Sequence, residues 1–243
     1  MNIDENINVE RIFTDTKTTK IDVRNLDVFS FSFSFELDFL AIFRILEKYK
    51  IPFSSKDRDD SYPLISAGGP VVTANPEPFA EIFDYIEAGD AENKTSLITD
   101  TIRANRGKPK REILKELAKI KGVYVPSLTR FDENKGMLTL DGEPYTVEKS
   151  TDSLSGICVT TPILTENSYF KNTFVIEIAR GCTQRCCFCN TAHINAPFRP
   201  CSYDIITEKI EQALPYTNKI AFLGAAVGAH PQIDKLCEFV LQK

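Results

Sequence analysis

A run of alternating phenylalanine and serine, followed at once by an apolar helical stretch, restricts the fold of this chain more than any other feature. In "DVFSFSFSFE", residues 27–36, the period of two sends alternate side chains to opposite faces of a strand, and the small serines would let a helix approach. The next stretch, "LDFLAIFRILEKYK", is apolar nearly all round, as expected of a helix packed on a sheet. A strand at 63–67 then ends at Gly68 and Gly69, "NPEPFAEIF" predicts a second helix, and "YIEAGDAE" predicts a third strand. This alternation predicts a mostly parallel α/β sheet with ligands at the carboxyl ends of its strands.

The alternation resumes after an irregular middle section. Two helical patterns lie between about Asn93 and Ile120, and short strand-like runs separated by polar turns follow from Gly122 to Ser150. A buried-type strand at 173–178 ends beside a cysteine-rich loop, and helix, strand and helix follow it. The carboxyl-terminal part therefore predicts two consecutive βα units. Two units cannot close a barrel, and the strand at 219–223 is expected to keep an open edge.

Composition limits the compartment and the partners. The chain has 243 residues, 42% hydrophobic and 26% charged, which is ordinary for a soluble globular protein. Its first ten residues, "MNIDENINVE", lack the basic and apolar regions of a secretory signal, and no apolar run approaches the ~18 residues needed to cross a bilayer. We expect a cytoplasmic protein without a membrane segment. The net charge of −5 argues against nucleic acid as a partner, and a solvated helix face accounts for the basic residues between Arg103 and Arg111.

Four of the seven cysteines lie within eight positions of "RGCTQRCCFC", residues 180–189. In a reducing cytosol, clustered thiols more often bind metal or do redox work than form disulfides. Cys182, Cys186 and Cys189 follow the spacing Cys-x-x-x-Cys-x-x-Cys, so one short loop could hold three corners of an iron–sulfur cube and leave one iron open. A structural zinc site is the alternative, with a fourth ligand from Cys187, Cys201 or His193, although zinc loops usually come as two separated cysteine pairs.

The residues around this loop have plainer interpretations. Arg180 and Arg185 could offset the negative charge of a thiolate-bound cluster, or could equally be surface residues. His193 and His230 are expected to be polar loop residues. The remaining cysteines are expected to be buried or bystander thiols, with Cys237 on the apolar stripe of its helix: Cys158, Cys187, Cys201 and Cys237.

At these residues the chain resembles the radical S-adenosylmethionine superfamily, in which this cysteine spacing follows the first strand of a partial or full βα barrel. Phe188 matches the aromatic residue that precedes the third cysteine and whose backbone lies near the adenine of S-adenosylmethionine. Upstream, "LISAGGPVVTANPEPFAEIFDYIEAGDAE" resembles the amino-terminal cobalamin-binding-like domain of one branch of the superfamily, and "KGVYVPS" resembles its connector.

The resemblance implies an α/β fold with three parts. A partial Rossmann-like, cobalamin-binding-like parallel sheet, incomplete at its start, would occupy residues 1–105, and a helical and β connector would occupy 106–170. The first βα units of an incomplete radical S-adenosylmethionine (TIM-like) barrel would occupy 171–243, so we expect a fragment truncated within the barrel.

The resemblance also implies cofactors and partners. A 4Fe-4S cluster on Cys182, Cys186 and Cys189 would bind S-adenosylmethionine at its open iron, beside Phe188 and Gly224, and an external reductase, flavodoxin or ferredoxin would supply the electron that forms a 5′-deoxyadenosyl radical. The family often has Gly-Gly-Glu where this chain has Gly224, Ala225 and Ala226, so a carboxylate contact to the methionine amino group is absent there. Cobalamin is a further candidate, with Gly68 and Gly69 on the corrinoid-side loop. The only two histidines, His193 and His230, lie in the barrel region, which excludes a lower axial histidine from the first domain.

Two hypotheses follow from the sequence. The first is a radical S-adenosylmethionine enzyme of unassigned substrate, of which this polypeptide alone would be weakly active or inactive because the remaining barrel is missing. The second is a noncatalytic metal-binding module, or a module that binds a corrinoid or a partner.

Overall fold

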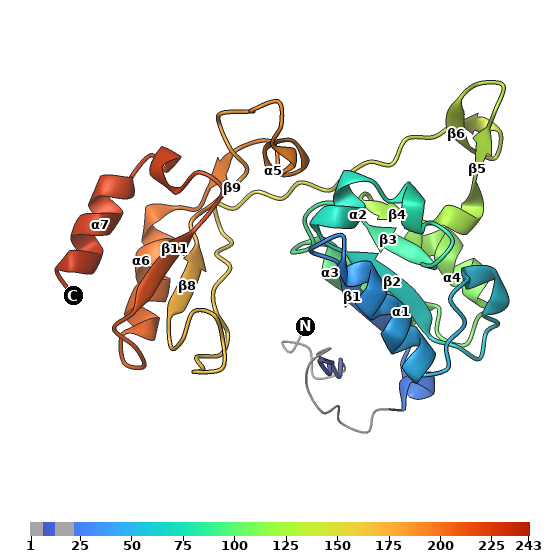
Figure 1. Ribbon diagram of the computed structural model, residues 1–243, viewed down its shortest axis with the longest axis horizontal. Coiled ribbons are helices and arrows are strands. Elements are labelled where there is room, and N and C mark those ends of the chain that lie inside the picture. Colours follow the sequence, from blue (N-terminus) through green and yellow to red (C-terminus); the bar gives the residue numbers. More distant parts are fainter. Residues whose placement is uncertain (1–6, 13–21) are drawn as a thin grey trace. The chain divides into compact units, whose positions relative to one another are not determined.

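The computed structural model describes residues 7–12 and 22–243, and Figure 1 shows its elements in colours that follow the chain. The expected incomplete start of the first domain lies partly outside these residues. The chain divides into two compact units, Met1–Asp152 and Ser153–Lys243. The segment expected to be a connector, 106–170, is shared between the two units, and its status as a separate domain stays a prediction.

The first unit is built on a four-stranded sheet that confirms the predicted mostly parallel arrangement. Its strands are β1 (Val28–Ser32), β2 (Leu64–Gly68), β3 (Tyr85–Glu87) and β4 (Val123–Tyr124), in that spatial order. The pairs β1–β2 and β2–β3 are parallel, and β3–β4 is antiparallel. The carboxyl ends of β1, β2 and β3 therefore meet at one edge of the sheet.

Helices cover both faces of this sheet. They are α1 (Asp38–Lys48), α2 (Pro70–Ala74), α3 (Lys94–Ala104) and α4 (Lys110–Leu117), joined by 3-10 turns at Val23–Asn25, Ser55–Asp57, Glu77–Phe79 and Pro126–Leu128. Successive residues of β2 enter different cores: Ile65 packs in the core beneath α1, whereas Leu64 packs with α3 and α4. This alternation is the period of two that a strand imposes on its side chains.

Three of the four alternating phenylalanines are buried, but the serine face does not receive the helix that the sequence led us to expect. Phe29, Phe31 and Phe33 are buried in the core with α1, while Ser30 and Ser32 are exposed. On that face α3 and α4 pack against Leu64 of β2 and Tyr85 of β3, and they leave the serines of the edge strand β1 uncovered.

The helix predicted from "NPEPFAEIF" is wrong. The helix of this region, α2, begins earlier, at Pro70 directly after Gly69, and ends at Ala74; residues 77–79 form only a 3-10 turn. Pro76 explains the break, because a proline disfavours helical backbone at the residue before it and supplies no amide hydrogen.

A small antiparallel sheet follows β4, as the short strand-like runs from Gly122 to Ser150 predict. Its strands are β5 (Thr129–Asp132), β6 (Met137–Leu140) and β7 (Glu143–Pro144). This sheet shares no strand with the parallel sheet of the first unit.

The second unit confirms two consecutive βα units. Strand β8 (Phe174–Glu177) leads through β9 (Ala179–Arg180), α5 (Asn190–Ile194) and β10 (Arg199–Pro200) to α6 (Tyr203–Ala213). Strand β11 (Ile220–Leu223) lies parallel to β8 and is followed by a 3-10 turn, Val227–Ala229, and α7 (Ile233–Leu241). The core of this unit is formed by buried aliphatic residues of β8, α6 and α7, including Ile176, Ile206 and Leu236. In the described part of the chain β11 pairs with β8 alone, so its other edge is open as expected and no barrel closes.

Candidate functional site

The cysteine loop, residues 181–189, leaves the carboxyl end of β8 through the short strand β9. Strand β9 pairs antiparallel with β10, and this pairing joins the two ends of the segment 181–198, which contains the loop and α5. Gly181 fits where another residue would not: its φ is +81°, and an added Cβ would lie 2.6 Å from the carbonyl oxygen of Pro197. The sequence prediction placed the loop at a strand end but missed β9, α5 and β10, because two- to five-residue elements carry almost no periodicity.

Cys182, Cys186 and Cys189 all lie on this one loop with free thiols. The Cys186 side chain is exposed, and those of Cys182 and Cys189 are partly exposed. The Gln184 amide donates to the Cys182 sulfur at 3.4 Å, and the Cys189 amide donates to the Cys186 carbonyl at 3.0 Å. The first of these hydrogen bonds holds the Cys182 sulfur against the backbone of the loop.

The three sulfurs are gathered on the loop without converging on one point. Among the described residues, no group of three or more His, Cys, Asp or Glu side chains has the geometry of a metal site. The donor set nevertheless fits an iron–sulfur cluster in kind, because it offers three accessible thiols and no competing disulfide.

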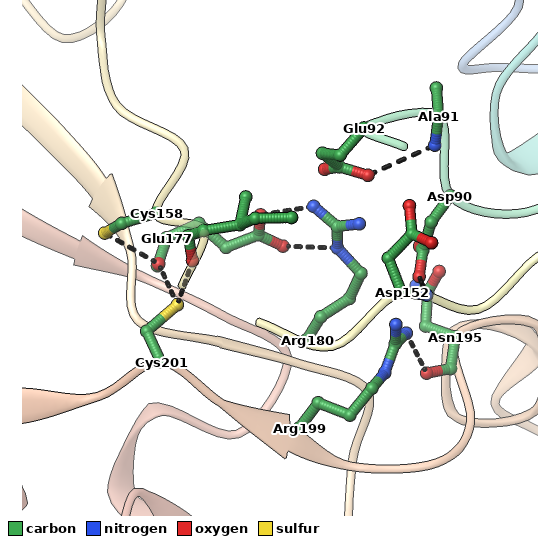
Figure 2. Close-up of polar contacts among 11 residues, drawn as sticks. Asp90, Ala91, Glu92, Asp152, Cys158, Glu177, Arg180, Asn195, Arg199 and Cys201 are labelled. Atoms are coloured by element: carbon green, nitrogen blue, oxygen red, sulfur yellow. Dashed lines mark hydrogen bonds and ion pairs between the residues drawn. The ribbon is translucent and has the colours of Figure 1, made fainter. Parts of the chain in front are cut away.

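The two arginines that flank the loop differ. Arg180 forms a two-pronged ion pair with Glu177, with its Nε 3.0 Å from Oε1 and a terminal nitrogen 2.7 Å from Oε2 (Figure 2). Its charge is therefore matched by the last residue of β8. Arg185 lies within the loop with a φ of +46°, one of four non-glycine residues with positive φ in the described chain.

Phe188 has an exposed side chain, whereas Gly224 lies where the backbone leaves no room for one. The Phe188 side chain is 91% exposed beside Cys189, which leaves its ring accessible to a ligand. Gly224 directly follows β11, and a Cβ there would lie 2.9 Å from the Ala179 carbonyl oxygen. The structure therefore gives Gly224 a packing reason for lacking a side chain, namely the close approach of the β11 end to β9.

Both histidines place a ring nitrogen within hydrogen-bonding distance of a backbone carbonyl oxygen. His230 is 3% exposed; its Nδ1 accepts the Gln232 amide at 3.2 Å, so Nε2 carries the proton and donates to the Cys201 carbonyl at 3.0 Å. His193 lies in α5, with Nε2 3.3 Å from the Cys186 carbonyl oxygen. His230 is therefore a structural residue, whereas His193 lies against the cysteine loop itself.

The cysteines outside the proposed ligand set fall into three environments. Cys187 is exposed on the loop, Cys201 is buried, and Cys158 is partly buried. Cys237 is exposed on α7, so its expected place on the apolar stripe of that helix is wrong; the core residue of this helix turn is Leu236.

A second candidate site lies at the carboxyl edge of the sheet in the first unit. Gly68 ends β2 opposite Glu87 of β3, and Gly69 has a φ of +117° with its Cα against the backbone of Phe33, where a Cβ would lie 2.6 Å from the carbonyl oxygen. These glycines let the chain turn tightly into α2. Sequence reasoning missed Glu87, whose position at the end of a strand could have identified it.

A partly buried carboxyl and a buried ammonium lie at this same edge. Burial raises the pKa of the Glu87 carboxyl, with the nearby Lys94 ammonium opposing the rise. Burial lowers the pKa of Lys94, whose ammonium donates to the carbonyl oxygens of Ala88 and Gly122 and to the Ser150 hydroxyl at 3.0–3.2 Å. Lys94 thus ties α3 to the chain that follows β3.

Comparison with known proteins identifies the family. The model of the family "Radical SAM proteins, N-terminal" matches residues 1–126, more than half of the chain. The chain belongs to this family. It is a radical S-adenosylmethionine superfamily protein, as the cysteine spacing and the upstream α/β pattern predicted.

Two longer proteins align with most of the chain. An uncharacterized protein of Methanocaldococcus jannaschii is 25% identical over 224 residues, which cover 90% of this chain and 42% of that protein. The solved structure of OxsB, a cobalamin-dependent S-adenosylmethionine radical enzyme with aqua-cobalamin and S-adenosylmethionine bound, matches with a TM-score of 0.52 and 19% identity. That match covers 89% of this chain and 29% of OxsB, so this chain spans less than half the length of either relative.

No helix in the described residues is long and apolar enough to cross a membrane.

Proposed function

We propose that Cys182, Cys186 and Cys189 hold a 4Fe-4S cluster and that S-adenosylmethionine binds at its open iron. The observation that carries the proposal is the presence of three free, accessible thiols on one short loop at the carboxyl end of β8, in a member of the radical S-adenosylmethionine superfamily. A cluster held by these three cysteines would pass an electron from an external donor to S-adenosylmethionine, for its reductive cleavage to a 5′-deoxyadenosyl radical.

The protein residues contribute binding and position. The pairing of β9 with β10 fixes the base of the loop, and the Gln184 amide donates a hydrogen bond to the Cys182 sulfur. Phe188 offers an exposed ring for the adenine next to Cys189, and Gly224 lets the end of β11 approach β9. The substrate contacts of the whole protein are not assigned.

Anaerobic reconstitution with iron and sulfide tests this proposal. About four irons and four sulfides per chain are expected, with the visible absorbance of a cluster. Cys186→Ser should lose the cluster, whereas Cys187→Ser, which changes the neighbouring exposed thiol, should keep it. Binding of zinc with no cluster absorbance, or equal losses in both variants, would reject the assignment.

We propose as the second candidate that the first unit binds a corrinoid at the carboxyl edge of β1, β2 and β3. The tight Gly68–Gly69 turn supports this function, because it brings backbone rather than side chains to the edge where parallel sheets bind ligands. OxsB, which shares the fold, binds aqua-cobalamin. Both histidines of this chain lie in the second unit, so the first unit would offer no imidazole to a corrinoid.

Spectral titration with cobalamin tests the corrinoid function independently of the cluster. A saturable change in the corrinoid spectrum is expected, and it should weaken when Gly68→Val places a branched side chain beside Glu87. An unchanged corrinoid spectrum at all concentrations would remove this function and leave the cluster assignment intact.

A further inference from the structure

Two cysteines that the proposed cluster does not use meet beneath the carboxyl end of β8. Cys158 lies in a strap, residues 153–161, that runs antiparallel beside β8 through an isolated bridge between Thr160 and Ile176. Cys201 directly follows β10, and its amide donates to the Ile178 carbonyl at 2.8 Å. The two residues are 43 positions apart in the chain but flank the same strand end.

Both thiols point at one atom, the Glu177 carbonyl oxygen. The Cys201 sulfur lies 3.1 Å from it and the Cys158 sulfur 3.7 Å (Figure 2). The Cys201 sulfur is also 3.4 Å from the Ile157 carbonyl oxygen, which belongs to the strap. Since both sulfurs approach a common acceptor, small side-chain rotations can bring them toward bonding distance.

We propose that Cys158 and Cys201 form a dithiol that reacts with low-molecular-weight disulfides and closes to an intramolecular disulfide. Cys158 is the entry thiol because it is partly exposed, and Cys201 is the resolving thiol because it is only 3% exposed. The disulfide would join the strap to the residue that follows β10, and it would involve none of the cysteines of the loop.

The electrostatics of the pair support this order of reaction. Interaction with the Cys201 thiol lowers the pKa of Cys158, against the opposing effect of burial. The same interaction, then burial and the charge of Cys158, raise the pKa of Cys201. A thiolate is the reactive form, so Cys158 reacts first. Once its sulfur is capped it carries no charge, and the effects that kept Cys201 protonated are reduced.

The exchange balances without any group from the cluster. The Cys158 thiolate attacks oxidised glutathione, the glutathione disulfide breaks, and the released glutathione takes up the proton that Cys158 lost. Cys201 then loses its proton and attacks the Cys158 sulfur, and a second glutathione leaves with that proton. The two protein thiols are oxidised by two electrons, and one glutathione disulfide is reduced to two thiols.

Peptide mapping of the full chain after treatment with oxidised glutathione tests the proposal. Cleavage after Phe198 and Tyr203 separates Cys201 from the cysteines of the loop, so the linked partner can be assigned. We expect a Cys158–Cys201 crosslink that a dithiol reductant reverses. In Cys201→Ala, glutathione should instead remain bound to Cys158.

Two further variants sharpen the test. Cys158→Ser should leave Cys201 as an unmodified thiol, because its entry partner is gone. Cys237→Ser, which removes an exposed thiol elsewhere in the unit, should leave the crosslink unchanged. Crosslinking of Cys158 to a loop cysteine in its place, or a Cys201 that is glutathionylated as readily in Cys158→Ser, would overturn the proposal.

Discussion

At the scale of single residues, Gly181 decides whether the cysteine loop can leave β9 as it does. Its positive φ costs a side-chain-bearing residue about 1–2 kcal/mol, and overlap of a new Cβ with the Pro197 and Asn195 carbonyl oxygens at 2.6–2.7 Å adds about 1–3 kcal/mol. We expect Gly181→Ala to lower the free energy of unfolding of the second unit accordingly. Urea unfolding measures the loss.

Gly228→Ala is the matched control, because Gly228 lies in the same unit and a Cβ there meets no atom within 4 Å. Its effect should stay within about 0.5 kcal/mol. Equal stability of the two variants would show that the base of the loop is not held as described.

Glu87 predicts a pH dependence of stability at the carboxyl edge of the first unit. Burial raises its pKa above the usual 4.5, so in the interval above pH 4.5 the folded chain keeps a proton that the unfolded chain has already released. The free energy of unfolding should therefore fall as the pH rises through that interval. Glu87→Gln should flatten this fall, which urea unfolding at a series of pH values measures.

The control for that experiment is Glu133→Gln, which removes an exposed carboxylate from the same unit. The fall in stability with pH should persist in this variant. If Glu87→Gln retains the full pH dependence, the Glu87 carboxyl is not the group that titrates.

The proposed cluster ligands were the part of the site most accessible to sequence reasoning. The spacing of Cys182, Cys186 and Cys189 is a local pattern, so it predicted a cysteine loop without knowledge of the fold. The contacts of Lys94 and the meeting of Cys158 with Cys201 join residues far apart in the chain, which no local pattern encodes.

At the scale of elements, a buried ion pair fixes the segment between α1 and β2. Arg58 and Asp84 are 3.0 Å apart, and Arg58 also donates to the carbonyl oxygens of Pro52, Phe53 and Ile82, at 2.6–3.0 Å. Asp84 in turn accepts the amide of Ile65 in β2 at 2.7 Å. One arginine therefore joins the loop to the central strands.

Arg58→Ala leaves the Asp84 carboxylate buried without its partner, so we expect a loss of about 3–5 kcal/mol in the free energy of unfolding. Arg106→Ala breaks an ion pair with Asp27 in which both side chains are more than half exposed, and it should cost about 0–1 kcal/mol. Denaturant unfolding compares the two. Losses of similar size would mean that Arg58 does not organise the loop.

Elements with a clear hydrophobic period were predicted correctly, and the two five-residue helices were not. The helix of residues 38–48 and the strand of 174–177 each show a clear hydrophobic pattern over their length. The five-residue helices α2 and α5 have at most two buried side chains each, which is too few to define a period. Their positions depend on Gly69 and on the pairing of β9 with β10, which are features of the folded backbone.

At the scale of the whole molecule, the two units divide the candidate chemistry between them. All seven cysteines follow Ser153 and thus belong to the second unit, while Gly68, Gly69 and Glu87 belong to the first. Each unit also closes cores of its own residues, as Phe33 and Leu117 do in the first and Ile206 does in the second.

A polypeptide of residues 1–152 should therefore fold alone and separate the two functions. We expect cooperative urea unfolding, because the cores around Phe33 and Leu117 and the contacts of Lys94 are complete within it. It should take up no iron or sulfide on reconstitution, since it has no cysteine, while any corrinoid binding shown by the full chain should persist with similar affinity. Cobalamin titration of the full chain and of this polypeptide, side by side, measures the difference. Corrinoid binding that is present in the full chain and lost from 1–152, despite cooperative unfolding, would place the corrinoid site outside the carboxyl edge of the β1–β3 sheet.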